Sequence, residues 1–300
     1  MRTRLMFFNG EIVPESAVRV SPFDHGFLYG DGIFEGIRAY QGRVFKLPEH
    51  MTRLYASAKS LLLTIPYSRE EMARAVIETV KANGLRDAYI RLVVSRGEGD
   101  LGLDPRNCAK PTVIIIADNI QLYPESFYDK GLPVASSAVR RPSGDVLNPQ
   151  IKSLNYLNSI LAKIEAGQRG VPEMILLNQW GHVVEGTGDN VFIVRRGALV
   201  TPPLSAGILP GVTRDTVMEI AQAHGIAVRE ENFTLHELYN ADECFLTGTA
   251  AEVVPVVTCD GRAIGSGMPG PLTREIRRLF MEYAATHGTD IYPNVTVSEA

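Results

Sequence analysis

Lys152-Ser153-Leu154-Asn155-Tyr156-Leu157 opens residues 148–190, the stretch around which the chain is organised, and Val184-Glu185-Gly186-Thr187-Gly188-Asp189-Asn190 closes it. Between them, apolar residues at three- and four-residue steps predict a helix with one apolar stripe. Lys152 would then lie just before a helix N-terminus, where the macrodipole and an apolar setting both favour its neutral amine. A neutral amine can form an imine with a carbonyl, so the stretch pairs a candidate nucleophile with a distant carboxylate. The stripe consists of Leu154, Leu157, Leu161 and Ile164.

The composition indicates an ordinary soluble globular protein. The 300 residues suffice for one large or two ordinary domains, with 45% hydrophobic and 21% charged residues. A net charge of -4 gives no electrostatic argument for a nucleic-acid partner. Cys108, Cys244 and Cys259 lack the spacing of a metal site or disulfide framework. We therefore expect a cytoplasmic protein with no metal, no targeting segment and no membrane segment.

The first half of the chain predicts two hairpins, two helices and two strands. Asn9-Gly10 and Gln41-Gly42 are turns between the strands 5–8 and 11–13, and between 33–40 and 44–47. The run 23–30 is predicted to be a shaped loop. Helices are expected from Pro48 towards Pro66 and, after a Ser68/Glu71 capping box, up to Asn83-Gly84. Strands are expected at 88–95 and 112–117, the second buried on both faces.

Residues 97–102 match the glycine-rich dinucleotide pattern, but no helix is predicted after them.

The segment 121–133 interrupts the pattern of predicted strands with Pro124, Gly131 and Pro133, and we predict that it links two domains. The smaller N-terminal domain would then span 1–120 and the larger C-terminal domain 134–300. The second half alternates strands and helices, so the predicted fold class is mixed α/β. Its predicted strands are 132–139, 174–177, 191–194, 199–200, 243–246 and 252–257, and its further helices are 213–224 and 272–283.

Two turns in the second half are candidate anion sites. Ile208-Leu209-Pro210-Gly211-Val212-Thr213-Arg214 opens a helix, whose first amides favour a phosphate. Leu246-Thr247-Gly248-Thr249-Ala250-Ala251 is a small-residue turn with free amides and hydroxyls. An imine-forming amine, a carboxylate for a pyridinium nitrogen and amides for a phosphate together match pyridoxal phosphate.

Six runs resemble those of the fold-type IV pyridoxal-phosphate enzymes, and most closely those of branched-chain amino acid aminotransferases. The similarity covers nearly the whole chain in the expected order. It implies the two-domain fold of D-amino-acid aminotransferase, with the cofactor at the domain interface. The runs are Phe34-Glu35-Gly36-Ile37-Arg38, Glu49-His50-Met51-Thr52-Arg53-Leu54, Lys152 to Leu157, Glu185 to Asn190, Leu209 to Arg214 and Gly248-Thr249-Ala250-Ala251-Glu252.

The resemblance also implies roles for individual residues. Lys152 would bind the cofactor covalently, Tyr156 its phenolic oxygen and Glu185 its pyridine nitrogen. The phosphate would be held by Arg53, Val212, Thr213 and Thr249, and the cofactor would also be bound by Leu209, Gly211 and Gly248. The substrate would be bound by Tyr29, Phe34, Gly36, Tyr89, Arg91, Thr249 and Ala250.

The implied activity is transamination between branched-chain L-amino acids and 2-oxoglutarate, with ping-pong kinetics and a homodimer or higher homo-oligomer as the working unit. D-amino-acid aminotransferases and aminodeoxychorismate lyases share the lysine, glutamate and phosphate turns. The D-specific enzymes hold the α-carboxylate with an arginine and a histidine after the strand 88–95. Here no histidine lies between Arg91 and Asp118, although Arg96 and Arg106 keep that alternative open. A nucleotide-dependent oxidoreductase using residues 97–102 is the alternative from another class.

Overall fold

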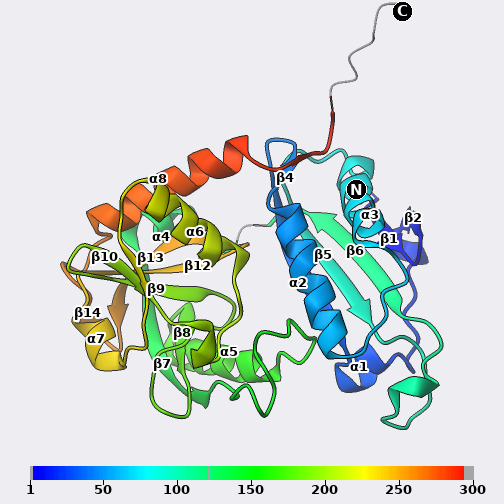
Figure 1. The fold of residues 1–300 in the computed structure, drawn as a ribbon, viewed down its shortest axis with the longest axis horizontal. Coiled ribbons are helices and arrows are strands. Elements are labelled where there is room, and N and C mark those ends of the chain that lie inside the picture. The colour runs from blue at the N-terminus through cyan, green and yellow to red at the C-terminus, as the bar shows by residue number, and fades with distance from the viewer. Residues whose placement is uncertain (1–2, 121, 294–300) are drawn as a thin grey trace, which may run out of the picture. The chain divides into compact units, whose positions relative to one another are not determined.

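The computed structural model describes residues 3–120 and 122–293. The chain divides into two compact units (Figure 1). The first contains Met1–Ile120, Lys152–Leu154 and Ala284–Ala300, and the second contains Gln121–Ile151 and Asn155–Tyr283. The domain boundaries drawn from the sequence, including the linker 121–133, stay a prediction.

The first unit is built on an antiparallel seven-stranded sheet in the order β15-β4-β3-β5-β6-β1-β2. Helices α2 and α3 pack on it (Figure 1). Its elements are β1 Leu5–Phe8, β2 Glu11–Pro14, α1 His25–Tyr29, β3 Gly32–Tyr40, β4 Arg43–Val44, α2 Leu47–Ser60, α3 Arg69–Ala82, β5 Ala88–Ser95, β6 Thr112–Asp118 and β15 Thr289–Asp290, with 3-10 turns at Glu15–Ala17 and Pro105–Asn107.

Both predicted hairpins are confirmed, and their turn chemistry explains them. Asn9 and Gly10 have φ of 51° and 111°, and Gln41 and Gly42 have φ of 50° and 89°. Such left-handed pairs match the twist of antiparallel strands. The strand after the second turn is shorter than predicted, because helix α2 already begins at Leu47.

The predicted capping box on α3 is confirmed, since the Ser68 hydroxyl accepts from the Glu71 amide and the Glu71 carboxylate accepts from the Ser68 amide. Two other expectations for this unit are wrong. The run 23–30 contains helix α1, capped by the Asp24 side chain. Strand β6 is fully buried only at alternate residues, such as Val113 and Ile115, because it lies in an antiparallel sheet.

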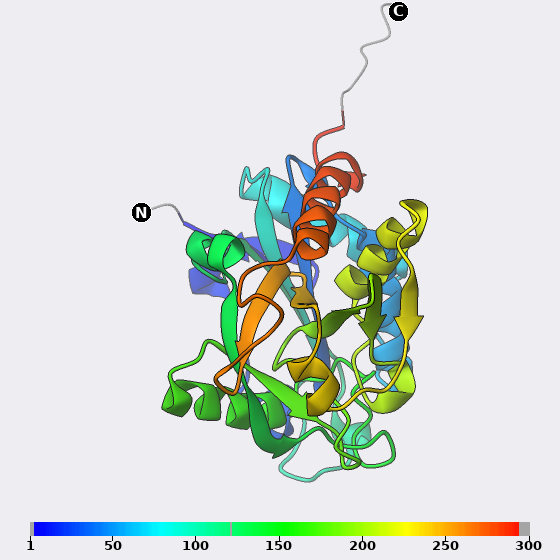
Figure 2. The ribbon, with the colours of Figure 1, turned by 90° about the vertical axis from the view of Figure 1, so that its left-hand side faces the viewer.

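The second unit contains an eight-stranded mixed sheet. Its order is β11-β10-β9-β12-β13-β7-β8, with β14 paired to β13, and the β13-β7-β8 run is parallel. Helix α5 packs on β7 and β8, and α6 on β12 and β11 (Figures 1 and 2). The elements are α4 Glu125–Lys130, β7 Leu132–Arg140, α5 Leu157–Arg169, β8 Glu173–Leu177, β9 Asn190–Arg195, β10 Ala198–Thr201, α6 Val212–Ala223, β11 Val228–Glu230, α7 Leu235–Tyr239, β12 Glu243–Gly248, β13 Glu252–Cys259, β14 Arg262–Ala263 and α8 Pro271–Thr286, with a 3-10 turn at Leu204–Ala206.

Helix α5 begins later than predicted. It begins at Leu157, five residues after Lys152, so the lysine is beyond the first turn in which a helix dipole acts. Its apolar stripe also faces outward, while the small residues Ser159, Ala162 and Ala166 are buried against the sheet. The large apolar side chains exposed on the helix are Leu157 (65%), Ile160 (51%), Leu161 (45%) and Ile164 (52%).

Within the described ranges 3–120 and 122–293, the structure contains no helix with the length and apolarity needed to cross a bilayer.

Candidate active site

Lys152 is held by its main chain against the first unit. Its carbonyl accepts from the Phe34 amide at 3.0 Å, and its amide donates to the Ser57 hydroxyl at 3.1 Å. The next residues continue this pairing, because Ser153 bridges Ile33 and the Leu154 amide donates to a carbonyl of β3 at 2.9 Å. The strand-like pairing explains why the helix predicted to begin just after Lys152 starts later.

Four of the predicted substrate residues lie together in this unit. The Lys152 Nζ lies 4.6 Å from the centroid of the Phe34 ring, and the Arg91 guanidinium lies 4.5 Å from the same centroid. Arg91 Nη2 donates to the Tyr89 hydroxyl at 3.1 Å. A Cβ on Gly36 would lie 2.4 Å from that hydroxyl, so only glycine leaves Tyr89 in this position. An amine, an aromatic wall and a cation therefore share one site.

Tyr29, the fifth predicted substrate residue of this unit, ends helix α1. Its hydroxyl donates to the Leu101 carbonyl at 2.6 Å, and its ring meets that of His25 edge-on at 5.1 Å. These contacts tie Tyr29 to the loop that follows β5.

Arg53, a predicted phosphate ligand, is one member of a buried charged cluster. Its Nε and Nη2 donate to the two Glu35 oxygens at 2.8 and 2.7 Å, and His50 Nδ1 lies 2.8 Å from the same carboxylate. Burial raises the pKa of Glu35, but the charge and hydrogen bonds of Arg53, aided by His50, lower it to about 2. Burial also lowers the pKa of His50, so this histidine is neutral at pH 7 and donates from Nδ1.

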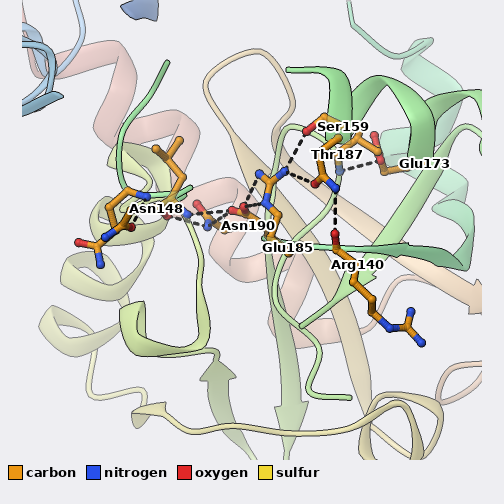
Figure 3. Close-up of polar contacts among 11 residues, drawn as sticks. Arg140, Asn148, Ser159, Glu173, Glu185, Thr187 and Asn190 are labelled. Atoms are coloured by element: carbon orange, nitrogen blue, oxygen red, sulfur yellow. Dashed lines mark hydrogen bonds and ion pairs between the residues drawn. The ribbon is translucent and has the colours of Figure 1, made fainter. Parts of the chain in front are cut away.

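Glu185 is held by donors on both of its oxygens (Figure 3). Oε1 accepts from Arg141 Nε at 2.7 Å, and Oε2 accepts from the Leu209 amide at 3.0 Å. Asn190 Nδ2 lies 3.4 Å from Oε2 and donates to the Leu209 carbonyl at 3.0 Å. The carboxylate is thus joined to the start of the predicted phosphate turn.

Both predicted phosphate turns pack directly on the acidic turn 185–190. A Cβ on Gly211 would lie 1.9 Å from Asn190 Oδ1, and a Cβ on Gly248 would lie 2.1 Å from Asp189 Oδ1. Gly211 caps helix α6, whose first residues are Val212 and Thr213, so the first amides of the helix are oriented for an anion.

The second turn follows strand β12, which ends at Gly248. Thr249 and Ala250 form the turn itself. The Thr247 hydroxyl beside it is buried and has no hydrogen-bond partner among the described residues. Tyr156 lies at the N-cap of α5. The ligand roles given to all these residues stay predictions.

The sequence assigned no individual role to Glu35, His50, Arg141 or Asn190, each of which contacts a predicted site residue. His50 is buried. The three-residue step from His50 to Arg53 on one helix face was the only local signal for their cluster. The partners of Glu185 carry no such signal, because Arg141 is 44 positions away.

Two alternatives depend on residues of the first unit: a D-amino-acid enzyme that uses Arg96 or Arg106, and a nucleotide-dependent oxidoreductase that uses residues 97–102. The contacts of these residues support neither alternative. The Arg96 guanidinium is already bound to both Asp31 oxygens, at 2.8 and 3.0 Å, and to the carbonyls of Leu61 and Leu62. Arg106 is paired with Asp104 two residues earlier. In the described chain, the glycines 97–102 are followed only by a three-residue 3-10 turn, where a dinucleotide site would need a helix.

Comparison with known proteins identifies the family. The family model described as amino-transferase class IV matches residues 32–259. A putative branched-chain-amino-acid aminotransferase of Methanocaldococcus jannaschii is 54% identical over 287 residues, covering 96% of this chain and 99% of the relative. The branched-chain-amino-acid aminotransferase of Escherichia coli K12 is 36% identical over 286 residues, covering 92% and 91%.

Solved structures agree with these sequences. The branched-chain aminotransferase of Thermoproteus uzoniensis with norvaline superposes with a TM-score of 0.91 at 40% identity, covering 97% of this chain and 100% of the other. The branched-chain amino acid aminotransferase of Thermobaculum terrenum in its PLP form gives a TM-score of 0.86 at 33% identity, covering 94% of each chain. The predicted fold class, mixed α/β of fold type IV, is confirmed.

Proposed function

Because the chain belongs to the class IV aminotransferases, we propose that it transfers amino groups between branched-chain L-amino acids and 2-oxoglutarate. Leucine, isoleucine and valine would give their 2-oxo acids, and 2-oxoglutarate would give L-glutamate. Pyridoxal 5'-phosphate is the cofactor of this class and of this enzyme. The observation that carries the substrate proposal is that the Lys152 amine and the Arg91 guanidinium lie 4.6 and 4.5 Å from the centroid of the same Phe34 ring.

The donor set fits the cofactor. Glu185 is a carboxylate held by N–H donors, as a partner of a pyridinium nitrogen should be, and helix α6 offers its N-terminal amides to a phosphate. The buried, unpaired Thr247 hydroxyl beside the second turn suits the same anion. The residues proposed to hold the cofactor are Arg53, Lys152, Tyr156, Glu185, Leu209, Gly211, Val212, Thr213, Gly248 and Thr249.

The bound cofactor supplies a ring that accepts the electron pair left when the amino acid loses its Cα proton. Lys152 would hold the cofactor covalently, and its amine would carry the Cα proton of the bound amino acid. Glu185 keeps the ring nitrogen protonated by accepting its hydrogen bond. Amino donor and oxo-acid acceptor use the same residues in turn, so the kinetics are ping-pong.

One pocket must accept an apolar side chain and the carboxylate of glutamate. Phe34 and Tyr89 give an apolar wall with a hydroxyl, and Arg91 would pair with the γ-carboxylate when glutamate enters. The amides of Gly248, Thr249 and Ala250 would take the α-carboxylate. Gly36 keeps room for Tyr89, and Tyr29 is the remaining proposed wall residue.

Reduction with borohydride tests the cofactor and lysine assignment. The purified enzyme should be yellow, lose its visible absorbance on treatment and keep the reduced label on the peptide containing Lys152. Lys152→Ala should bind the cofactor without this label. A colourless protein that does not respond to added pyridoxal phosphate would refute the proposal.

Half-reactions test the substrate class. L-leucine, L-valine and L-glutamate should each convert the cofactor to its amine form, whereas D-alanine should not. Arg91→Met should lose L-glutamate far more than L-leucine, because only glutamate carries a second carboxylate. Reaction of D-alanine without L-leucine would establish the D-amino-acid alternative instead.

The enzyme is proposed to act as a homodimer or a higher homo-oligomer. The support is the exposed apolar stripe of α5, because surfaces of this kind are usually covered by a partner. Sedimentation should give at least twice the chain mass. A Leu161→Glu variant should shift towards the monomer, and an unchanged mass would exclude α5 from the interface.

We also propose a cytoplasmic location, since all three cysteines, in the described ranges, are free.

A further inference from the structure

Arg141 directs its whole guanidinium at one cluster in the second unit. Nε donates to Glu185 Oε1 at 2.7 Å, and Nη2 lies 2.5 Å from the same oxygen. Nη1 donates to the Ser159 hydroxyl at 3.0 Å and lies 3.2 Å from Asn158 Oδ1. The Arg141 amide donates to the Leu177 carbonyl at 2.9 Å. Main chain and side chain are therefore both fixed.

The other side of Glu185 is fixed as well. Oε2 receives the Leu209 amide and the Asn190 side chain, and Asn190 in turn binds the Leu209 carbonyl. Figure 3 shows the Glu185 carboxylate with Asn190 on one side and, on the other, the guanidinium that contacts Ser159. With donors on both oxygens, the carboxylate has one orientation, and Arg141 supplies the positive charge that balances it.

We propose that Arg141 is a positioning residue for transamination, which keeps the Glu185 carboxylate correctly oriented as the acceptor for the cofactor's ring nitrogen. The proposal rests on the function proposed above, in which Glu185 is that partner. Without Arg141, the carboxylate would keep only the Leu209 amide and the Asn190 side chain, and both of these contact Oε2. A Glu185 carboxylate that turned away would no longer accept a hydrogen bond from the ring nitrogen, and the ring nitrogen would lose its proton.

The ring nitrogen itself reports on this role. Cofactor labelled with ¹⁵N at that position should give the chemical shift of a protonated pyridine in the wild-type enzyme. In Arg141→Met the shift should move towards that of an unprotonated nitrogen. The cofactor dissociation constant should rise and kcat should fall, each by about 10- to 100-fold, because a misplaced group costs about that much.

Arg140 provides the matched control. It is the adjacent arginine, but its Nη1 donates to the Ser137 carbonyl, and Figure 3 shows its side chain directed away from Glu185. Arg140→Met should keep the wild-type ¹⁵N shift, affinity and kcat. Equal effects of the two substitutions would mean that any lost arginine perturbs this loop, which would overturn the proposal.

A double-mutant cycle separates positioning from general stability. If Arg141 acts through Glu185, then Arg141→Met should add little further loss in kcat to a Glu185→Gln enzyme, because the two residues work as one unit. Arg141→Lys, which keeps the charge but not the fork, should restore part of the ¹⁵N shift. These variants carry the test if Arg141→Met alone does not fold.

The outcomes distinguish the two claims. A wild-type enzyme that does not bind pyridoxal phosphate overturns the proposed function and, with it, the role of Arg141. A wild-type enzyme with a protonated ring nitrogen, together with an Arg141→Met enzyme of identical shift and kcat, overturns only the role of Arg141. Additive losses in the cycle do the same.

Discussion

Substitution of Glu35 by glutamine tests the buried cluster around Arg53. Glu35 is 0% exposed, and the Arg53 guanidinium binds both of its oxygens. Its pKa of about 2, against an ordinary 4.5, corresponds to ~3 kcal/mol of stability. Removal of one partner from a buried ion pair typically costs about 3 to 5 kcal/mol, because the other charge stays buried. We therefore expect Glu35→Gln to lower the free energy of unfolding by about 3 to 5 kcal/mol at pH 7.

The effect of Glu35 should depend on pH in a definite direction. The pKa is lower in the folded chain, so the stabilisation is fully present above pH 4.5 and is lost as the pH falls towards 2. The difference in unfolding free energy between wild type and Glu35→Gln should therefore be largest near neutral pH. It should shrink progressively below pH 4.5.

Urea titrations followed by far-ultraviolet circular dichroism, at pH 7 and at pH 4, measure this difference. Glu49→Gln on helix α2 is the control, because Glu49 is exposed and its Lys46 contact is 3.4 Å long. Such surface pairs contribute about 0 to 1 kcal/mol. If Glu35→Gln is no less stable than Glu49→Gln, or if its deficit grows towards acid pH, the reasoning is refuted.

Three further substitutions test local features. Leu62 is 87% exposed with a φ of 50°, so Leu62→Gly should relieve backbone strain and add up to about 1 kcal/mol, seen as a higher Tm; a lower Tm contradicts this. Ser68→Ala should remove the capping box and cost about 1 kcal/mol in the same assay, and an unchanged Tm would count against the box. Gly211→Ala should displace Asn190 and weaken cofactor binding at least about tenfold in a fluorescence titration. The control Gly167→Ala, with open space around its Cβ, should keep the wild-type affinity. Equal affinities of the two variants would show that the contact between Gly211 and Asn190 does not matter for cofactor binding.

Local chemistry made much of the fold predictable. Asn9-Gly10 accepts the left-handed backbone of its turn, and the Ser68 and Glu71 side chains cap α3 within three residues. Such signals involve neighbours in the sequence, so they survive without knowledge of the tertiary structure. The same holds for Gly211, which opens helix α6 as expected.

The main errors concerned α5 and Lys152, where distant contacts decide the outcome. Residues 152–154 satisfy their main-chain groups on β3 instead of extending the helix, and nothing nearby in the sequence announces that pairing. The sequence predicted one apolar stripe on the helix, but the sheet packs on the small residues Ala162 and Ala166. Periodicity identifies an apolar face without specifying whether the same chain or another copy covers it.

The contacts of the site residues also could not be predicted from the local sequence. Arg53 and Glu185, both identified through the family resemblance, each lie in a buried ion pair within their own unit. In the first unit a glutamate, Glu35, holds the arginine expected to bind phosphate; in the second an arginine, Arg141, holds the glutamate expected to bind the ring nitrogen. A buried charge that must face a ligand needs a counter-ion when the ligand leaves, since an unpaired one is costly. The two supporting residues follow from that requirement, which is why the structure reveals them although sequence motifs do not.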